Sequence, residues 1–207
     1  MIETVVVDLG GVAARFLPER RLQALASLSG VPEDLIRERL FDSGFERQAE
    51  LGAYSPDQVL AAVQAALDHP VPVAALIDAW ALGFEPDTQV LECIVSLPVS
   101  SALFTNNGPL LNACLAGPLR ALSATFDEII CSWHVRARKP EAAAFERAAE
   151  RLQRSPDRLL LLDDSAANVH AAIRCGWDAD RVTGLADVLA ALGRRAGLQR
   201  HAARRAQ

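Results

Sequence analysis

Lysine is almost absent from this chain of 207 residues. Of its 21 lysine and arginine residues, only Lys139 is a lysine. An ammonium group is a compact charge on a flexible stem, whereas the guanidinium group of arginine is a planar fork. We therefore single out Lys139, in the segment RARKPEAAAFE, as a candidate functional residue. The alternative is that one lysine occurs here by chance.

Cysteine is scarce and long apolar runs are missing. The four cysteines lie far apart and form no C-x-x-C pair, and a chain of this length needs no disulfide framework. No apolar run approaches the roughly 18 residues of a membrane span, and no basic-then-apolar leader opens the sequence. We therefore expect buried, reduced cysteines in a soluble cytoplasmic protein that has no membrane partner.

The charge balance gives no reason to expect binding to nucleic acid, since the formal net charge is −5. One local excess of arginine occurs in residues 193–207, which we interpret as a solvated, helix-compatible tail. With 51% apolar residues, the chain is long enough for one sizeable core, or for a core domain that carries a small insert. The sequence gives no indication of oligomeric state.

Short apolar runs rich in branched residues predict strands at 4–8, 99–105, 128–131 and 159–163, and a weaker one near 181–183. Helix-length segments such as 140–153 and 165–175 lie between the later runs, and Gly176 is a candidate helix C-cap. Strands that alternate with helices are typical of a parallel sheet covered on both faces. We predict an α/β fold with a Rossmann-like, doubly wound parallel sheet.

The segment after the first predicted strand differs, because its pattern is almost wholly helical. Four helix-compatible stretches there begin at or beside a proline, which suits the first turn of a helix. We predict an α/β core made of residues 1–16 and 85–207, with residues 17–84 as an all-helical insert.

Polar side chains follow three of the predicted strands: Asp8, Thr105 with Asn106, and Asp163 with Asp164. The carboxyl ends of parallel strands border the ligand crevice in such sheets. Three carboxylates in one crevice repel each other unless a cation lies among them, and hard oxygen ligands favour Mg²⁺. Lys139 suits a charge that bridges a carboxylate and a phosphate. The structural alternative is that these polar residues only cap helices or close turns.

Four segments, in this order and spacing, resemble the motifs of the haloacid dehalogenase-like (HAD) hydrolase superfamily: VVVDLGGV, LFTNNG, RKPEAAAFE and LLLLDDSAANV. The helical insert resembles the C1-type cap of that superfamily. The D-L-G-x-V form of the first motif and the cap stretch FERQAELGAYSPDQV resemble the glucose-1-phosphatase-like branch. The resemblance implies an Mg²⁺-dependent phosphatase of small phosphorylated metabolites such as sugar phosphates.

The resemblance also implies a role for each site residue. Asp8 is the expected nucleophile, which forms an aspartyl phosphate that water then hydrolyses. The expected Mg²⁺ ligands are Asp8, the backbone carbonyl of Gly10 and Asp164, with Asp163 as a further or water-mediated ligand. The expected phosphate-binding groups are the hydroxyl of Thr105, the amide of Asn106 and the ammonium of Lys139, and Arg47 is a candidate substrate ligand from the cap.

Gly10 departs from the pattern, because most phosphatases of the superfamily carry there a second Asp that protonates the leaving group. Loss of such a group typically costs about 10²- to 10⁴-fold in rate. One explanation is that the enzyme uses substrates whose leaving oxygen needs less help from an acid, or takes a substitute acid from the cap stretch that holds Glu46, Arg47 and Glu50. The others are an L-2-haloacid dehalogenase, which also lacks the second Asp, and a catalytically impaired phosphate-ligand binder.

Further candidates carry weaker signals. Asn168 lies one helical turn past Asp164 and either orients the metal ligands or is a surface residue. We interpret His134 and His170 as structural. Cap packing or ligand contact is expected of three aromatic residues, namely Phe16, Tyr54 and Trp80.

Overall fold

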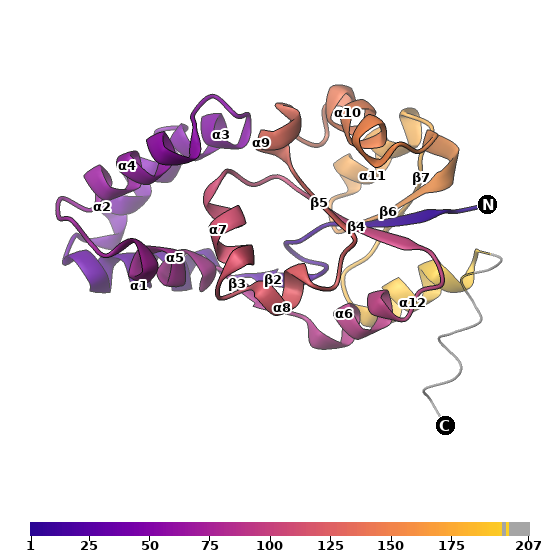
Figure 1. Cartoon of the computed structure of the whole chain (residues 1–207), viewed down its shortest axis with the longest axis horizontal. Helices are drawn as coiled ribbons and strands as arrows, with labels where there is room; N and C mark the ends of the chain where they lie inside the picture. Colours follow the sequence, from indigo (N-terminus) through magenta and orange to yellow (C-terminus); the bar gives the residue numbers. More distant parts are fainter. Residues whose placement is uncertain (196–197, 199–207) are drawn as a thin grey trace.

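A parallel sheet forms the centre of the protein in the computed structural model, which describes residues 1–195 and residue 198. Within these residues, five strands pair in the order β5-β4-β1-β6-β7, all in parallel (Figure 1). The strands are β1 (Thr4–Val7), β4 (Ser100–Thr105), β5 (Glu128–Cys131), β6 (Leu159–Asp163) and β7 (Asp178–Arg181). The chain winds outward from β1 in both directions, which confirms the predicted doubly wound sheet.

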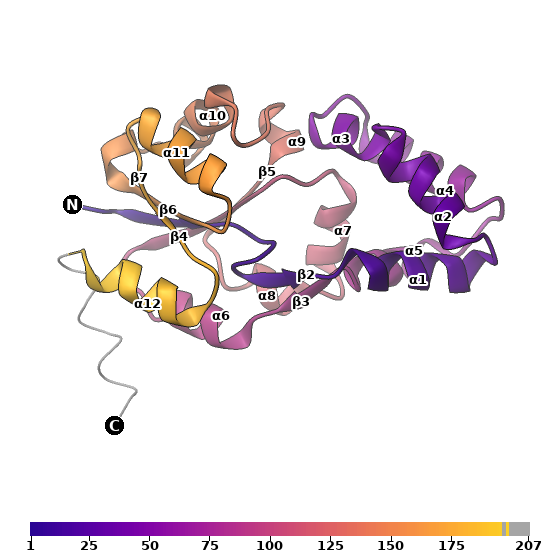
Figure 2. The same cartoon turned by 180° about the vertical axis from the view of Figure 1, so that it is seen from behind.

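Helices cover both faces of this sheet. Helices α10 (Ala142–Leu152) and α11 (Ala166–Arg174) lie on one face, and α6 (Thr88–Val95) and α12 (Leu185–Gly193) lie on the other (Figures 1 and 2). Val5 and Val7 of β1 belong to one apolar cluster and Val6 to the other. Because both faces of β1 are buried, its sequence is a continuous apolar run without alternation.

The remaining helices of the core are short. They are α7 (Leu110–Ala116), α8 (Arg120–Ser123), α9 (Ser132–Val135) and a 3₁₀ turn (Pro156–Arg158). Gly176, the predicted C-cap after α11, has a φ of 84°, the left-handed conformation that favours glycine there.

Strand β7 differs from its prediction, because it covers Asp178–Arg181 and not 181–183. Its sequence, DADR, has no apolar run from which a strand could be recognised. It is an edge strand, where charged residues protect the open backbone. Arg195, beyond α12, forms ion pairs with Asp178 and Asp180 of this strand. The rest of the basic tail, apart from Gly193, Arg194 and Leu198, lies outside the described residues.

The predicted helical insert contains α1 (Pro18–Ser29), α2 (Glu33–Arg37), a π-helix (Glu38–Asp42), α3 (Phe45–Glu50), α4 (Pro56–Ala66) and α5 (Val73–Ala81). We call residues 17–84 the cap. A two-stranded antiparallel ribbon, β2 (Ala14–Phe16) and β3 (Phe84–Pro86), joins it to the core. This ribbon was not predicted, since strands of three residues carry almost no periodic signal.

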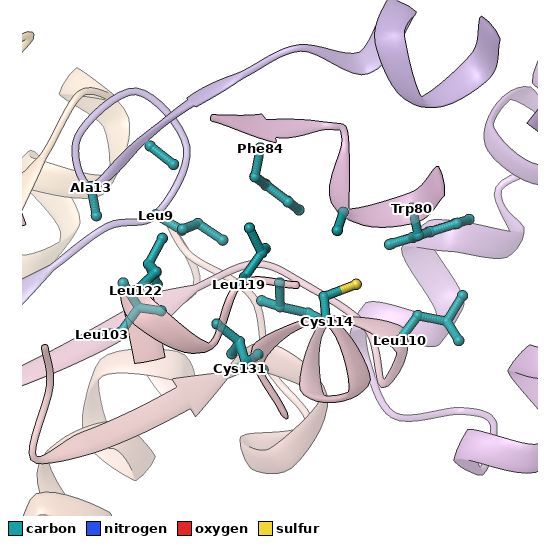
Figure 3. Packing of buried hydrophobic residues seen from close by; sticks show 14 of the residues in the cluster. Leu9, Ala13, Trp80, Phe84, Leu103, Leu110, Cys114, Leu119, Leu122 and Cys131 are labelled. Carbon is teal, nitrogen blue, oxygen red and sulfur yellow. The ribbon is translucent and has the colours of Figure 1, made fainter. Parts of the chain in front are cut away.

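The cap and the core share one apolar cluster. Figure 3 shows part of it, from Leu9 and Leu103 of the core to Trp80 of α5. Cys114 and Cys131 are buried in this cluster, and burial raises the pKa of each thiol to about 12. All four cysteines are free, but Cys93 and Cys175 are only half-buried, so the prediction of buried cysteines was wrong for these two. No helix of the described residues is long and apolar enough to cross a membrane.

Phe145 anchors the opposite face of the sheet, where its ring meets Phe104 and Trp177 edge-on at 6.0 and 5.7 Å between centroids. Phe145→Ala is expected to lower the free energy of unfolding by about 3–5 kcal/mol, because it leaves a cavity in a buried aromatic cluster. Urea unfolding measures this change. Ile173→Ala is the control, because Ile173 on the nearby α11 is 53% exposed; equal losses would contradict the packing described here.

Candidate active site

A cavity of about 210 Å³ lies between the carboxyl edge of the sheet and the cap. The core contributes residues that follow β1 and end or follow β4, together with Lys139 and Asn168. The ribbon contributes Phe16 and Phe84. The cap contributes Arg21, Glu46 and Glu50. The topology therefore places the predicted catalytic residues Asp8, Thr105 and Lys139 in one cavity.

Lys139 is 3% exposed, and its ammonium donates to three acceptors. The Nζ atom lies 2.8 Å from Oδ1 of Asp8, 2.6 Å from Oδ2 of Asp163 and 2.7 Å from the carbonyl oxygen of Phe104. An ammonium has three N–H donors that can diverge in this way, whereas the donors of a guanidinium share one plane. Burial opposes the charged form, but the two carboxylates outweigh it and raise the pKa of Lys139.

Asp163 is completely buried at the end of β6. Its Oδ1 accepts from the backbone N–H of Ser165 and from Nδ2 of Asn168, both at 2.9 Å. Its Oδ2 accepts from Lys139 and, at 3.1 Å, from the same Nδ2 of Asn168. Both oxygens of Asp163 are thus bonded by protein donors. Because one of these donors is the ammonium of Lys139, Asp163 fixes the position of Lys139. Asn168 is half-buried and holds Asp163 in place, so the surface alternative for Asn168 was wrong.

Asp8 follows β1, and its backbone N–H donates to the carbonyl of Leu162 at 2.9 Å. Burial raises the pKa of its carboxyl to about 6, although Lys139 opposes the shift. Burial also raises the pKa of Asp164, and the charge of Asp163 adds to this. One oxygen from each of Asp8, Asp163 and Asp164 lies within 4.8 Å of the others.

The residues of this cluster fit a divalent cation. Three carboxylates face a single ammonium, so the cluster carries excess negative charge, and hard oxygen donors are the ligands of Mg²⁺. Gly11 makes room for Asp164, because a Cβ at Gly11 would lie 2.3 Å from Oδ2 of Asp164. The φ of Gly11 is 89°, which also favours glycine.

Thr105 and Asn106 lie beside Lys139 but differ in what they offer. Oγ1 of Thr105 accepts from Nδ2 of Asn107 at 2.8 Å, which leaves the hydroxyl proton for an acceptor in the cavity. The side chain of Asn106 is paired with the backbone of Lys139, accepting from its N–H at 2.9 Å and donating to its carbonyl at 2.8 Å. Asn106 therefore fixes the Lys139 segment with its amide oxygen and one amide N–H, and the second N–H of the same amide is left for a phosphate. The prediction missed Asn107, which lines the cavity.

Arg47, the predicted cap ligand, is exposed and is not among the residues that line the cavity. Glu46 and Glu50 are four residues apart on α3 and share its inner face, from which Arg47 is turned away. The arginine that lines the cavity is Arg21 of α1. A helical periodicity could have revealed Arg21, because it lies on the buried stripe of α1 with Leu22 and Leu25.

Arg21 is 1% exposed and surrounded by aromatic rings. Its guanidinium carbon lies 5.4, 4.5 and 5.1 Å from the ring centroids of Phe16, Trp80 and Phe84. Nε donates to the carbonyl of Trp80 and Nη1 to Oε1 of Glu46, both at 3.2 Å. Nη2 is buried without a hydrogen-bond partner within the described residues. Burial lowers the pKa of Arg21, and Glu46 opposes the shift.

Glu50 connects the cap to the core. Its Oε2 lies 2.5 Å from Nε of Arg138, the residue before Lys139. Of the other candidates, Tyr54 stacks on Phe45, and Trp80 packs on Arg21. His134 lies against Asn112 and the backbone N–H of Cys131, and His170 is exposed on α11; neither is among the described residues that line the cavity.

Fold and site together define a capped α/β protein with a carboxylate cluster at the carboxyl edge of its sheet. The model of the haloacid dehalogenase-like hydrolases matches residues 2–176, and the chain belongs to this family. The predicted superfamily is thereby confirmed, whereas the C1 type of the cap and the glucose-1-phosphatase-like branch stay predictions. A search of curated proteins finds no match.

Similar solved structures share the fold. A HAD family enzyme from Bacteroides thetaiotaomicron, in complex with magnesium and inorganic phosphate, has 20% identity and a TM-score of 0.71, over 87% of this chain and 94% of that one. A HAD-like family hydrolase from Porphyromonas gingivalis has 24% identity and a TM-score of 0.70, over 88% and 92%. The L-2-haloacid dehalogenase from Xanthobacter autotrophicus has 22% identity and a TM-score of 0.60, over 94% and 82%.

Gly11→Ala is expected to weaken Mg²⁺ binding at least tenfold, because the new methyl group displaces the carboxylate of Asp164. The left-handed backbone adds a stability cost of roughly 1–2 kcal/mol. Isothermal titration with Mg²⁺ measures the first effect and urea unfolding the second. Gly30→Ala is the matched control: Gly30 has a φ of 75° and open space around it, so only the backbone cost applies. Unchanged Mg²⁺ affinity in Gly11→Ala would contradict the assignment of Asp164 as a ligand.

Proposed function

We propose that this hydrolase is an Mg²⁺-dependent phosphatase of small phosphorylated metabolites, with sugar phosphates as the substrate class. The observation that carries the proposal is the ammonium of Lys139 between Asp8 and Asp163, next to a carboxylate cluster that fits a divalent cation. Positive charge beside Asp8, from Lys139 and from a divalent cation, suits the attack of the Asp8 carboxylate on an anionic ester. The magnesium and phosphate bound by a structural relative support the same chemistry.

In this proposal Asp8 attacks phosphorus and forms an aspartyl phosphate, which water then hydrolyses. Lys139 and the hydroxyl of Thr105 neutralise and hold the phosphoryl oxygens. Asp8, Asp164 and the carbonyl of Gly10 would hold the metal, while Asp163, whose oxygens are both bonded by protein donors, orients Lys139. The bound Mg²⁺ supplies positive charge that lets an anionic nucleophile approach an anionic ester.

The cap and ribbon residues that line the cavity support a small, hydroxylated substrate. A volume of about 210 Å³ has room for a metabolite and not for a macromolecule. The charge of Arg21 is already balanced by Glu46, so a neutral hydroxyl is a better partner for its free Nη2 than a second anion. The rings of Phe16 and Phe84 offer flat apolar surfaces for a sugar ring.

A second candidate is hydrolysis of L-2-haloacids, in which a carboxylate displaces halide without a metal. Gly10 favours it, because no second carboxylate follows the nucleophile, and so does the fold shared with a known dehalogenase. The adjacent Asp163 and Asp164 favour the phosphatase. Halide release from 2-chloropropionate in the presence of EDTA separates the two functions.

Phosphate release from p-nitrophenyl phosphate and from sugar 1- and 6-phosphates tests the proposal directly. Turnover is expected with Mg²⁺ and not with EDTA. Asp8→Asn is expected to abolish turnover, since an amide cannot attack phosphorus, while circular dichroism stays unchanged. Asp57→Asn, on the exposed start of α4, is the control and should keep full activity. Full activity in Asp8→Asn would remove the proposed nucleophile.

Arg21→Lys tests recognition of the sugar. Leaving hydroxyl groups of the substrate unpaired costs roughly 1–3 kcal/mol, so kcat/KM for a sugar phosphate should fall about tenfold or more. Acetyl phosphate is too short to reach the cap end and should lose less than threefold. Equal losses for both substrates would assign Arg21 to the packing of the cap and not to substrate recognition.

A further inference from the structure

When the phosphoryl group moves to Asp8, the leaving oxygen of the substrate needs a proton. Gly10 has no side chain that could donate it. The leaving oxygen of a sugar phosphate departs as an alkoxide unless an acid protonates it. In an in-line displacement this oxygen points away from the nucleophile, which here means away from the strand ends and toward the cap. The acid must therefore be a cap residue that lines the same cavity as Asp8.

Two cap carboxylates meet this condition, Glu46 and Glu50 of α3. Glu46 is bonded to the guanidinium of Arg21, and both lie in the aromatic end of the cavity. Glu50 lies one helical turn further along, is 8% exposed, and is paired with Arg138, the neighbour of Lys139 in the chain. Glu50 therefore lines the same cavity as Asp8 and Lys139, and its partner Arg138 belongs to the Lys139 segment.

We propose that Glu50 is the general acid and base of this site and replaces the carboxyl group that Gly10 lacks. This inference rests on the proposed phosphatase function. Glu50 protonates the leaving oxygen in the first step and accepts a proton from water in the second.

The proton balance closes over the two steps. In the first, Asp8 forms a bond to phosphorus, the bond from phosphorus to the substrate oxygen breaks, and the proton of Glu50 goes to that oxygen. In the second, water forms a bond to phosphorus while its proton goes to Glu50, and the bond to Asp8 breaks. Asp8 is again a carboxylate, Glu50 is again protonated, and inorganic phosphate leaves.

The surroundings of Glu50 suit both tasks. Burial raises the pKa of its carboxyl to about 7, with Arg138 opposing and Glu46 adding to the shift. Arg21 on α1 is the other charged group that acts on it. A general acid is most effective when its pKa lies near the working pH. Arg138 also stabilises the carboxylate that forms when the proton has left.

The test compares Glu50→Gln on two leaving groups. With a sugar 6-phosphate, which leaves as an alkoxide, kcat should fall about 10²- to 10⁴-fold. With p-nitrophenyl phosphate, whose leaving group needs no proton, the first step, measured as the burst of p-nitrophenolate, should stay within about threefold. Its steady-state rate should fall, because Glu50 no longer accepts the proton of water in the second step. The wild type should also lose activity on the sugar phosphate as the pH rises through about 7, and Glu50→Gln should lack this limb.

Two further variants separate acid catalysis from a structural ion pair. Arg138→Met removes the same cap-to-core pair but keeps the carboxyl. Because Arg138 lowers the pKa of Glu50, this variant should move the alkaline limb to higher pH and keep the leaving-group preference. If Glu50→Gln does not fold, an unmoved limb in Arg138→Met overturns the proposal. Glu38→Gln, at an exposed position of the π-helix, is the isosteric control and should leave all rates unchanged.

Rescue completes the test. A Cβ at Gly10 would meet only Phe16, at 3.5 Å, which is an ordinary van der Waals contact, so this position has room for a Cβ. Gly10→Asp in the Glu50→Gln background should restore turnover of the sugar phosphate at least tenfold. Equal losses in the first step with both leaving groups, or the predicted pattern in Glu46→Gln, would overturn the role of Glu50. Absence of any Mg²⁺-dependent turnover in the wild type would instead refute the phosphatase function itself.

Discussion

The buried ammonium of Lys139 is the interaction on which the rest of the site depends. A charged group inside a protein is tolerated only when its donors are satisfied and its charge is balanced. Asp8, Asp163 and the carbonyl of Phe104 do both, and they come from three adjacent strands of the sheet. The same three bonds hold the nucleophile of the proposed reaction in place. They also explain why the one lysine of an otherwise arginine-only chain lies here, since diverging acceptors suit an ammonium and not a planar fork.

The buried charges that the cap brings to the other side of the cavity are also paired. Arg21 balances Glu46, and Arg138 balances Glu50, so each buried charge that faces the ligand has an opposite charge beside it. The ammonium and carboxylates at the strand ends are not balanced in this way, and their excess negative charge favours a divalent cation. The cavity is thus lined by a metal-compatible carboxylate cluster and by a neutral Arg21–Glu46 pair with aromatic rings around it. This division suits a substrate with one phosphorylated and one uncharged, hydroxylated part.

Much of the core could be predicted because buried parallel strands are continuous apolar runs. Strands β5 and β6 match the predicted 128–131 and 159–163 residue for residue. The polar edge strand β7 and the short ribbon were missed or misplaced, because their pairing depends on neighbours that are distant in sequence. Arg47 was chosen for a related reason, whereas the apolar stripe of α1 could have revealed Arg21. The sequence shows which charges occur in a helix, but the side that faces the cavity depends on how the helix packs.

The sequence by itself determined the class of fold, the family, and the order of Asp8, Thr105, Lys139 and Asp163 along the chain, because these follow from local patterns and motifs. Only the tertiary structure decided what each group does with its neighbours. It engaged both oxygens of Asp163 with protein donors, paired the side chain of Asn106 with the backbone of Lys139, and placed Glu50 beside Arg138. Hydrogen bonds and burial depend on distances of a few ångströms between segments far apart in the chain, and no local pattern contains those distances.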